Sequence, residues 1–387
     1  MDLNHVCFLA DHYPTEQDPV YNFVGELVKA IADTGVKCTV ISPQNSSLQK
    51  NDKTARPFHW VQTTASGSEI QVYHPVFLSF SKLSKYGFNN WGRKISVMKC
   101  YQKISKQFTI PVDAFYAHFW SAGLYAAELA LKYKKPYFVA TGESVFSDGD
   151  KVYDKTRKSK NTLSGCICVS TKNQREAVEA GFVDLDKTRV IPNAIDPNRF
   201  YRIDKMECRK MLGYSNDDFI TVFVGGFNER KGIDRVAAAI NPLDGVKSVY
   251  IGKGVIQPKD KNIVFCGSLP HHKLVTYLNA ADVFVLPTRA EGCCNAIIEA
   301  MGCGLAVISS DGDFNKDILN DRYAIQVNSE DIDGIQKAII YLRDHKDICT
   351  QMGKFAWEAS LGLHLNDRAK KIIDYMSECI CREGGAR

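Results

Sequence analysis

The sequence of 387 residues lacks long hydrophobic runs and paired cysteine motifs. It has no stretch of 18 or more apolar residues, so we expect no membrane-spanning helix. The first residues show no basic segment followed by an apolar one, so we expect no signal peptide. None of the 13 cysteines forms a C-x-x-C pair, and many lie in apolar runs. Buried, reduced thiols and a cytoplasmic location are therefore expected.

Acidic residues are missing from one long segment. Residues 1–196 hold 24 Lys/Arg and 19 Asp/Glu, whereas the rest of the chain holds 25 of each, so the first half carries the whole net charge of +5. Between Ile70 and Val112 there is no carboxylate. The basic residues that alternate there with aromatic ones are Lys82, Lys85, Arg93, Lys94, Lys99, Lys103 and Lys106. Such a face is usually only solvated, but its one sign favours an anionic membrane surface or acceptor and a peripheral location on the inner face of the membrane. No nucleic-acid-binding motif accompanies it, so nucleic acid is not an expected partner.

Apolar strands alternate with helical patterns along the whole chain. This alternation predicts the α/β class, with parallel sheets covered by helices on both faces. The strands expected in the first half are His5–Leu9, Lys37–Ile41, Asp113–Ala117, Tyr137–Ala140 and Cys166–Val169. The strands expected in the second half are Phe219–Val224, Val249–Ile251, Ile263–Cys266, Val283–Leu286 and Ala306–Ser309.

Turn signals near Pro192-Asn193 and Asp196-Pro197 separate the two halves. We therefore expect a Rossmann-like domain over residues 1–196, a second over 197–355, and a C-terminal helix over 356–387 that crosses back to the first. In such domains ligands bind at the carboxyl ends of the strands, so two facing domains would form one deep cleft.

The most informative segment runs from Leu286 to Gly304. A predicted strand ends at Pro287, a loop carries Glu291, and a helix beginning near Asn295 carries Glu299. The free amides at this helix start, those of Asn295 and Ala296, suit a phosphate group. A carboxylate only accepts hydrogen bonds and can take both hydroxyls of a ribose. Two glutamates eight positions apart are usually unrelated, so the interpretation depends on the segments around them.

This segment resembles the E-x7-E signature of the family 4 retaining glycosyltransferases, which have the GT-B fold. Six further segments resemble motifs of that family in the same order, densely over residues 185–310 and more thinly over 1–180: Val190–Asp196, Phe223–Gly232, Ile251–Gly254, Phe265–Pro270, Ala281–Pro287 and Gly302–Gly304. The resemblance departs from the family at Gly226, where an arginine is frequent, and in the loop from Asp11 to Asn22, which has no glycine pair.

The resemblance implies a role for each matching residue. Glu299 is expected to hold the ribose, Glu291 to lie near the transferred sugar, and Lys231, assisted by Arg230, to neutralise the leaving diphosphate. His118 matches the second histidine of an H-x-H motif and is expected to position donor or acceptor, although a lone histidine in an apolar segment is usually structural. Further contacts to the donor are expected at Gly225, Gly226, Gly254, Leu269, Cys294, Asn295 and Ala296.

The implied activity is transfer of a sugar from a nucleoside-diphosphate sugar to a glycan or lipid-linked acceptor with retention of configuration. Biosynthesis of a cell-surface polysaccharide or glycoconjugate is its expected setting. A UDP-sugar is favoured over a GDP-sugar, and no metal or other cofactor is expected, because four scattered D-x-D pairs in an aspartate-rich chain are best explained by chance. A sugar phosphorylase, a sugar-nucleotide epimerase and a non-catalytic nucleotide-binding scaffold remain as alternatives.

Overall fold

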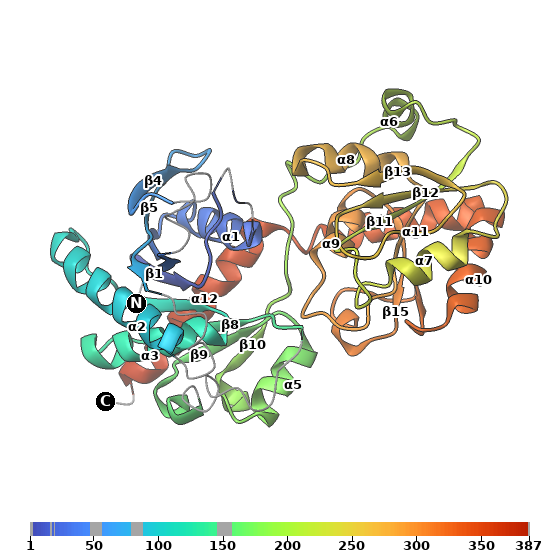
Figure 1. Cartoon of the computed structure of the whole chain (residues 1–387). Coiled ribbons are helices and arrows are strands. Elements are labelled where there is room, and N and C mark those ends of the chain that lie inside the picture. The colour runs from blue at the N-terminus through green and yellow to red at the C-terminus, as the bar shows by residue number, and fades with distance from the viewer. Residues whose placement is uncertain are drawn as a thin grey trace. The chain divides into compact units, whose positions relative to one another are not determined.

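The computed structural model describes residues 3–15, 18, 20–46, 56–78, 88–144 and 157–385. The chain divides into two compact units, both drawn in Figure 1. Unit 1 comprises Met1–Val169, Asn173–Ile191 and Arg368–Arg387, and unit 2 comprises Ser170–Lys172 and Pro192–Asp367. The main chain thus leaves unit 1 after Ile191, whereas the sequence placed the boundary after residue 196. The reason is that Ile195 already pairs with a segment of unit 2 around His364.

Unit 1 is built on an eight-stranded sheet with the order β10-β9-β8-β7-β1-β2-β5-β4. Its strands pair in parallel, except that β4 and β5 form an antiparallel pair at one edge. The strands are β1 (His5–Ala10), β2 (Lys37–Ile41), β4 (His59–Thr63), β5 (Glu69–Tyr73), β7 (Ala114–His118), β8 (Tyr137–Thr141), β9 (Gly165–Cys168) and β10 (Thr188–Val190). A small separate sheet pairs β3 (Gln44–Asn45) with β6 (Val76–Phe77).

The helices of unit 1 pack apolar faces against this sheet. In α1 (Asn22–Ala32), the buried residues Val24, Leu27, Val28 and Ile31 recur at helical spacing and so share one face. The other helices are α2 (Phe88–Ile104), α3 (Trp120–Tyr133), α5 (Thr171–Glu179, whose first residues are grouped with unit 2) and α12 (Leu365–Gly385).

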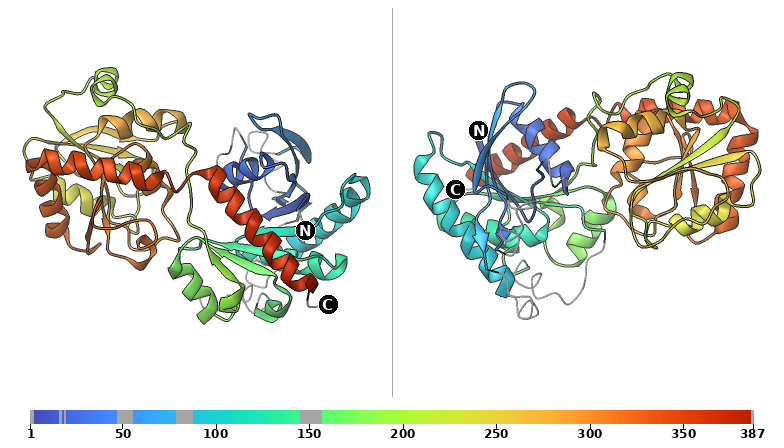
Figure 2. Two further views of the ribbon diagram at one scale, coloured as in Figure 1. Left: turned by 180° about the vertical axis from the view of Figure 1, so that it is seen from behind. Right: turned by 45° about the horizontal axis from the view of Figure 1, so that its top comes forward.

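The C-terminal region differs from the single helix predicted over 356–387. The structure has two helices there, because α11 (Lys346–Ser360) ends before α12 begins at Leu365. The interruption has a backbone cause: Ile195 N–H donates to the Leu363 carbonyl and Leu365 N–H donates to the Ile195 carbonyl, each at 2.9 Å. Helix α12, red in Figure 2, packs on the sheet of unit 1, where Tyr375 Oη donates to the Lys187 carbonyl at 2.7 Å.

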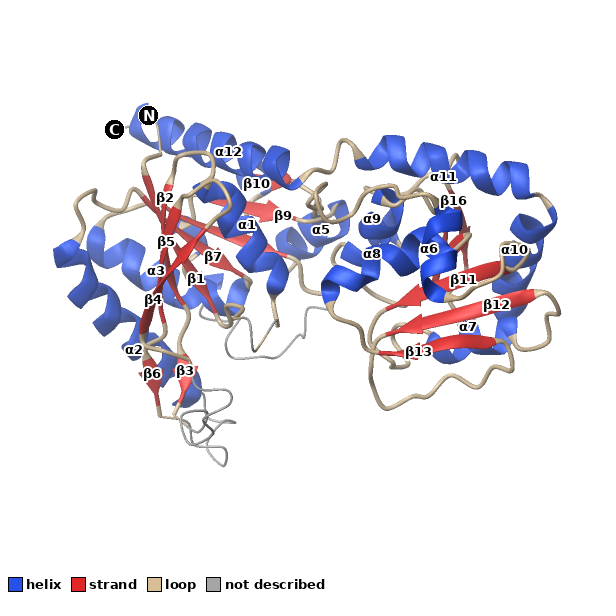
Figure 3. Ribbon diagram, turned by 90° about the horizontal axis from the view of Figure 1, so that it is seen from above, coloured by secondary structure: helices blue, strands red, loops and turns tan. Residues whose placement is uncertain are grey.

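Unit 2 is a six-stranded parallel sheet with the order β13-β12-β11-β14-β15-β16. Figure 3 shows its strands flanked by helices. The strands are β11 (Phe219–Val224), β12 (Val246–Ile251), β13 (Ile263–Gly267), β14 (Val283–Leu286), β15 (Ala306–Ser310) and β16 (Ala324–Val327). The helices are α6 (Lys205–Leu212), α7 (Ile233–Ile240), α8 (His271–Ala280), α9 (Asn295–Gly302), α10 (Ile332–Asp344) and α11.

The strand order defines where each unit can bind a ligand. In unit 2 the chain builds outward from β11 in one direction and then restarts at β14 on its other side, so the direction switches between these two strands. In unit 1 the corresponding switch lies between β1 and β7. Open α/β sheets bind ligands at the carboxyl ends of the strands flanking such a switch. The loops after β11 and β14, and those after β1 and β7, are therefore the places to examine.

Two further expectations from the sequence concerned buried, reduced thiols and the lack of a membrane-spanning helix. All 13 cysteines lie among the described residues as free thiols, and all but Cys266 and Cys381 are buried. In the described part of the chain, none of the helices combines the length and apolar character that crossing a bilayer requires.

Candidate active site

The loop after β11 brings the backbone of several segments unusually close together. A Cβ atom on Gly252 would lie 1.9 Å from the Gly225 carbonyl oxygen, and one on Gly254 would lie 2.2 Å from the carbonyl oxygen of Phe227. Gly232 has φ +77°, a conformation that favours glycine, and directly precedes α7. These glycines let the β11 loop fold tightly against the loop after β12, which fixes the backbone position of Lys231.

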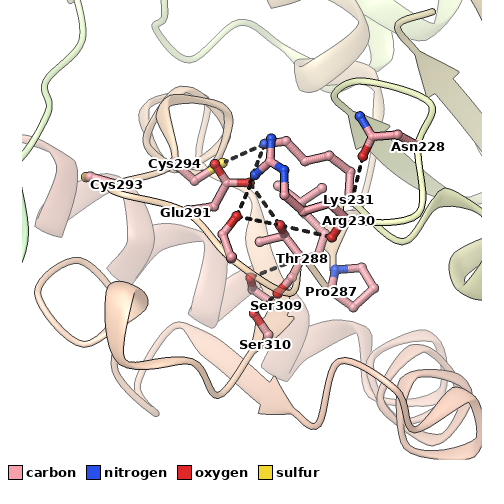
Figure 4. A network of polar contacts seen from close by, with 12 residues as sticks. Asn228, Arg230, Lys231, Pro287, Thr288, Glu291, Cys293, Cys294, Ser309 and Ser310 are labelled. Atoms are coloured by element: carbon pink, nitrogen blue, oxygen red, sulfur yellow. Dashed lines mark hydrogen bonds and ion pairs between the residues drawn. The ribbon is translucent and has the colours of Figure 1, made fainter. Parts of the chain in front are cut away.

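The loop after β14 carries Glu291, and three side chains converge on its Oε1 atom (Figure 4). Lys231 Nζ and Arg230 Nη1 each lie 2.7 Å from this oxygen, and Thr288 Oγ1 donates to it at 2.9 Å. The Lys231 and Glu291 side chains are 13% and 12% exposed, whereas Arg230 is 39% exposed. The two strands at the switch point of unit 2 thus place two cations and one carboxylate in direct contact.

Lys231 remains a cation in this enclosed position. Burial disfavours its charge, but the negative charge that Cys294 carries once it ionises at high pH and that of the Glu291 carboxylate outweigh this effect, so the pKa of Lys231 is raised above its ordinary value. The Cys294 sulfur lies 3.9 Å from Lys231 Nζ, and burial raises the pKa of the Cys294 thiol. At neutral pH the site therefore holds an ammonium group beside a neutral thiol.

Helix α9 begins at this point, with Cys294 as its N-cap residue. The amides at this helix start, those of Asn295 and Ala296, are suited to an anion, and the Cys294 sulfur contacts the backbone amides of Ala296 and Ile297. Asn295 Oδ1 is also buried with no hydrogen-bond partner in the described part of the chain. An unpaired buried acceptor at a helix start points to a ligand that completes the site.

Glu299 lies farther along α9, and its side chain is 13% exposed. Its Oε1 atom is 3.6 Å from Nε2 of His271, the first residue of α8. Leu269 follows β13, and the neighbouring Ser268 hydroxyl donates to the Gly252 carbonyl at 3.2 Å. The structure thus brings the residues predicted on the second domain to one edge of one sheet, at the ends of β11, β12, β13 and β14.

Several residues that support this site were missed at the sequence level. Arg235, on α7, is 5% exposed and donates to the Glu229 carbonyl at 3.0 Å and to the Pro287 carbonyl at 3.1 Å, which ties the β11 loop to the β14 loop. Ser310 Oγ donates to the Thr288 carbonyl at 2.7 Å. A helical arginine and a strand serine carry no local signal of such contacts, so only the fold could reveal them.

His118 belongs to unit 1 and is the last residue of β7, not the residue after the strand as predicted. The strand extends to it because His118 pairs with Ala10 of β1 and with Ala140 of β8. It is 6% exposed, and its Nδ1 atom is buried without a hydrogen-bond partner among the described residues. Burial, aided by Arg368, lowers the pKa of His118 to about 3, so the imidazole is neutral at physiological pH.

The turn after His118 has a second carboxylate that the sequence did not single out. Phe119 has φ 71° and ψ 156°, a strained conformation for a residue with a side chain, and α3 begins directly after it. Glu143, which follows β8, accepts hydrogen bonds from Trp120 N–H at 3.0 Å, Gly142 N–H at 2.9 Å and the Thr141 hydroxyl at 2.5 Å. Glu143 therefore caps α3 and holds the turn in place.

The D-x-D pairs have different structural settings. Asp148 and Asp150 lie outside the described residues, whereas Asp331 caps α10 by accepting from Gly334 N–H at 2.9 Å. Asp184 forms an ion pair with Lys160 at 2.7 Å. Over the part of the chain that the structure describes, no group of three or more His, Cys, Asp or Glu side chains is arranged to hold a metal ion.

Comparisons with known proteins agree with this geometry. Residues 20–199 match the model of Glycosyltransferase Family 4, and residues 218–345 match the model of Glycosyl transferases group 1. One relative is a Bacillus subtilis (strain 168) protein that is named as the teichuronic acid biosynthesis glycosyltransferase TuaC. It is 28% identical over 322 residues, which cover 79% of this chain and 80% of that protein. A UDP-Gal:α-D-GlcNAc-diphosphoundecaprenol α-1,3-galactosyltransferase of Escherichia coli is 26% identical over 230 residues, covering 54% of this chain and 58% of that protein.

The fold is also that of solved glycosyltransferase structures. A sucrose-phosphate synthase from Thermosynechococcus elongatus superimposes with a TM-score of 0.76 at 17% identity, covering 99% of this chain and 100% of that one. A likeness at this identity concerns the architecture of two Rossmann-like halves, and it confirms the fold class predicted from the sequence. With family models matching both halves, this chain belongs to the group 1 glycosyltransferases of the GT-B fold.

Proposed function

We propose that this glycosyltransferase moves a sugar from a nucleoside-diphosphate sugar, with a UDP-sugar favoured over a GDP-sugar, to a glycan or lipid-linked acceptor with retention of configuration. One observation carries the proposal: Lys231 and Arg230 converge on Glu291 beside the start of α9. Two cations and the amides of a helix start at the switch point of a doubly wound sheet suit a diphosphate.

The chemistry assigned to these groups is electrostatic. When the bond to the sugar breaks, negative charge develops on the leaving diphosphate, and fixed positive groups stabilise that charge most in the transition state. Lys231 is held in place by Glu291 and by its backbone N–H, which donates to Asn228 Oδ1 at 3.0 Å. In this proposal Lys231, Arg230 and the amides of Asn295 and Ala296 neutralise the diphosphate, and no metal is needed for that step.

The remaining donor contacts follow from where residues lie around this centre. Glu299, on the same helix, takes the ribose hydroxyls. Gly225, Gly226 and Gly254 give backbone access to the donor, and Leu269 lies beside the base, which backbone groups read. Glu291 keeps its expected place near the transferred sugar, because its carboxylate is anchored next to the leaving phosphates.

Retention is assigned to a front-face route, in which the leaving phosphate helps to deprotonate the acceptor hydroxyl. Two carboxylates, Glu291 after β14 and Glu143 after β8, support this route, since each is already occupied by hydrogen-bond donors. Glu291 Oε1 is held by Lys231, Arg230 and Thr288, and Glu143 is held by two amides and a hydroxyl. Carboxylates held in this way are poor nucleophiles. His118 is assigned to positioning donor or acceptor, as a neutral imidazole.

The acceptor is assigned by analogy with the relatives. The Bacillus subtilis relative is named for teichuronic acid biosynthesis, and the Escherichia coli relative is named for an acceptor on diphosphoundecaprenol. We therefore place this enzyme in the biosynthesis of a cell-surface polysaccharide or glycoconjugate, acting on a lipid-linked glycan.

A lipid-linked acceptor would make contact with an anionic membrane surface useful, and the basic run of unit 1 offers one. On α2, Trp91 is 61% exposed and Lys99 is exposed. Part of the charge is compensated, because Lys94 pairs with Glu128 at 2.8 Å and Arg93 lies 3.5 Å from Asp11. Lys82 and Lys85 lie outside the described residues. Peripheral attachment therefore rests on fewer free charges than the sequence alone indicates.

The decisive experiment separates transfer from the alternatives on the same architecture. The protein is incubated with UDP-, GDP- and ADP-sugars, first alone, then with inorganic phosphate, then with GlcNAc-diphosphoundecaprenol. A transferase consumes donor chiefly in the presence of the acceptor, and an α-linked product from an α-linked donor establishes retention. Consumption that depends on phosphate identifies a phosphorylase, conversion of donor alone identifies an epimerase, and binding without consumption identifies a scaffold.

A further inference from the structure

The surroundings of Glu299 contain a histidine that none of the roles above uses. His271 presents Nε2 to Glu299 Oε1 at 3.6 Å, while Nδ1 on the opposite side of the ring is in hydrogen-bond contact with Nη2 of Arg199. The Phe200 ring packs edge-on against the imidazole, with centroids 5.3 Å apart and an interplanar angle of 89°. All four residues belong to unit 2. The three contacts hold the imidazole from different directions.

The contact with Arg199 determines which nitrogen of His271 carries the proton. A guanidinium group only donates hydrogen bonds, so the Nδ1 atom that it contacts is assigned as the acceptor. The hydrogen then resides on Nε2, the atom that faces Glu299. Arg199 therefore donates to His271, and the donor nitrogen of His271 faces the Glu299 carboxylate at 3.6 Å.

The segment that carries Arg199 packs against α9, the helix that carries Glu299. Gly302 lies three positions after Glu299 on α9, and a Cβ atom there would lie 3.2 Å from the Phe200 carbonyl oxygen and 2.4 Å from Ile195 Cδ1. The glycine thus lets the segment that carries Arg199 and Phe200 pack directly on α9. Phe200 itself is 5% exposed, so it is a fixed support for the imidazole.

We propose that His271 is a positioning residue for Glu299, which donates from Nε2 to one carboxylate oxygen so that the other faces the ribose hydroxyls of the donor. The proposal rests on the function proposed above and adds a residue to it. The separation of 3.6 Å is slightly longer than a hydrogen bond, and such contacts commonly tighten when the ligand arrives. The imidazole is 43% exposed and Glu299 only 13%, so the histidine is the more accessible of the two side chains.

The test compares nucleotides with and without ribose hydroxyls. UDP, GDP and ADP are titrated by calorimetry, and the tightest of them, together with its 2′,3′-dideoxy analogue, is the probe. His271→Phe keeps the ring but removes the donor, and we expect it to weaken binding of the ordinary nucleotide about tenfold. The dideoxy analogue, which has no hydroxyls for Glu299 to hold, should bind wild type and variant equally. His271→Gln keeps a donor near the Nε2 position and should restore most of the affinity, and His272→Phe, on the exposed neighbouring residue, is the matched control.

Glu299→Gln separates failure of this inference from failure of the proposed function. If Glu299→Gln weakens nucleotide binding and His271→Phe does not, the ribose role stands and the role of His271 is overturned. An equal loss for both nucleotides in His271→Phe also overturns it, because the histidine then acts elsewhere. If Glu299→Gln leaves affinity unchanged, the ribose assignment itself fails. Should His271→Phe not fold, His271→Ala replaces it, with the same discrimination between the two nucleotides expected.

Discussion

The ammonium group of Lys231 and the carboxylate of Glu291 are in direct contact, 2.7 Å apart, although they come from loops after two different strands. Both side chains are largely enclosed, so the pair is fixed before any ligand arrives. A cation that is already charged and already oriented needs little reorganisation when charge develops beside it, which is the condition for effective electrostatic catalysis.

Replacing Lys231 with alanine should therefore reduce turnover far more than it affects folding. Removal of one preorganised charge-stabilising group typically lowers the catalytic rate by about 100- to 1000-fold. Steady-state transfer and a thermal melt measure the two effects, with Lys253→Ala on the nearby exposed loop as the control. A variant within about threefold of wild type would transfer the role to Arg230 or another cation.

Replacing Glu291 with glutamine should separate nucleotide binding from transfer. In the unliganded site Glu291 holds the cations that a diphosphate would need, so loss of its charge removes a competing anion. We expect affinity for the nucleoside diphosphate to rise while transfer falls, and calorimetry beside a transfer assay measures both. A parallel drop in affinity and transfer would mean that Glu291 mainly orients the two cations.

The segment Val190–Asp196 contacts the loop that leads into α9 through Asn193, whose side-chain amide donates to the Cys293 carbonyl at 3.0 Å. Loss of one such hydrogen bond costs about 0.5–1.5 kcal/mol. In Asn193→Ala the loop that leads into α9 should loosen, and nucleotide affinity should fall several-fold with little change in melting temperature. Asn198→Ala, on an exposed residue nearby, serves as the comparison; an equal effect of the two substitutions would argue against the loop contact.

The stability of unit 1 should decrease in mild acid because of two buried histidines. Burial is the main cause that lowers the pKa of both His74 and His118 from 6.5 to about 3. The unfolded chain takes up these protons first, so this contribution is fully present above pH 6.5 and is lost as the pH falls towards 3. At pH 5 the loss amounts to about 2 kcal/mol per histidine.

Urea unfolding followed between pH 7.5 and pH 5 measures this loss. His74→Phe should flatten the dependence, whereas His272→Phe on the surface should leave it as it is. An unchanged slope in His74→Phe would show that this histidine is protonated in the folded protein.

Binding to membranes should depend on lipid charge and on salt. Each basic residue near an anionic leaflet contributes roughly 1 kcal/mol, and screening acts beyond about 8 Å at physiological ionic strength. We expect sedimentation with phosphatidylglycerol vesicles but not with phosphatidylcholine vesicles, weakening as salt rises. The triple substitution of Lys94, Lys99 and Lys103 with glutamine should reduce vesicle binding without affecting donor hydrolysis. The matched triple substitution of Lys253, Lys259 and Lys273 should not reduce vesicle binding. Equal binding to both vesicle types would instead indicate apolar insertion, for which Trp91 is the exposed candidate.

The central strands were the most predictable part of the fold, and the edges were the least. The ranges predicted for β11 and β14 match the structure residue for residue, because each is a solid apolar run closed by Gly225 or Pro287. The antiparallel pair β4 and β5 was not predicted, since an edge pair needs only alternate residues buried and so gives a weak signal.

The site residues were also only partly predictable, because a sequence shows signals within a short segment but not contacts between distant segments. Glu291, Glu299 and Lys231 were found because they lie in spaced motifs within short segments. Arg235 and His271 were not found, because their partners are distant along the chain: Arg235 contacts Pro287, and His271 contacts Arg199. Contacts of that kind become visible only when the strand order brings the segments together.

The pairing of Ile195 with the segment around His364 has a consequence for how the protein is synthesised. Unit 2 enters and leaves at one place, so it is an insertion with adjoining ends, and unit 1 is the interrupted one. Helix α12 supplies Ile372, Tyr375 and Met376 to the interior of unit 1, and all three are at most 1% exposed. The ribosome makes this helix after the whole of unit 2. Unit 1, although its first strands emerge before unit 2 does, therefore completes its core only after the inserted unit has left the ribosome.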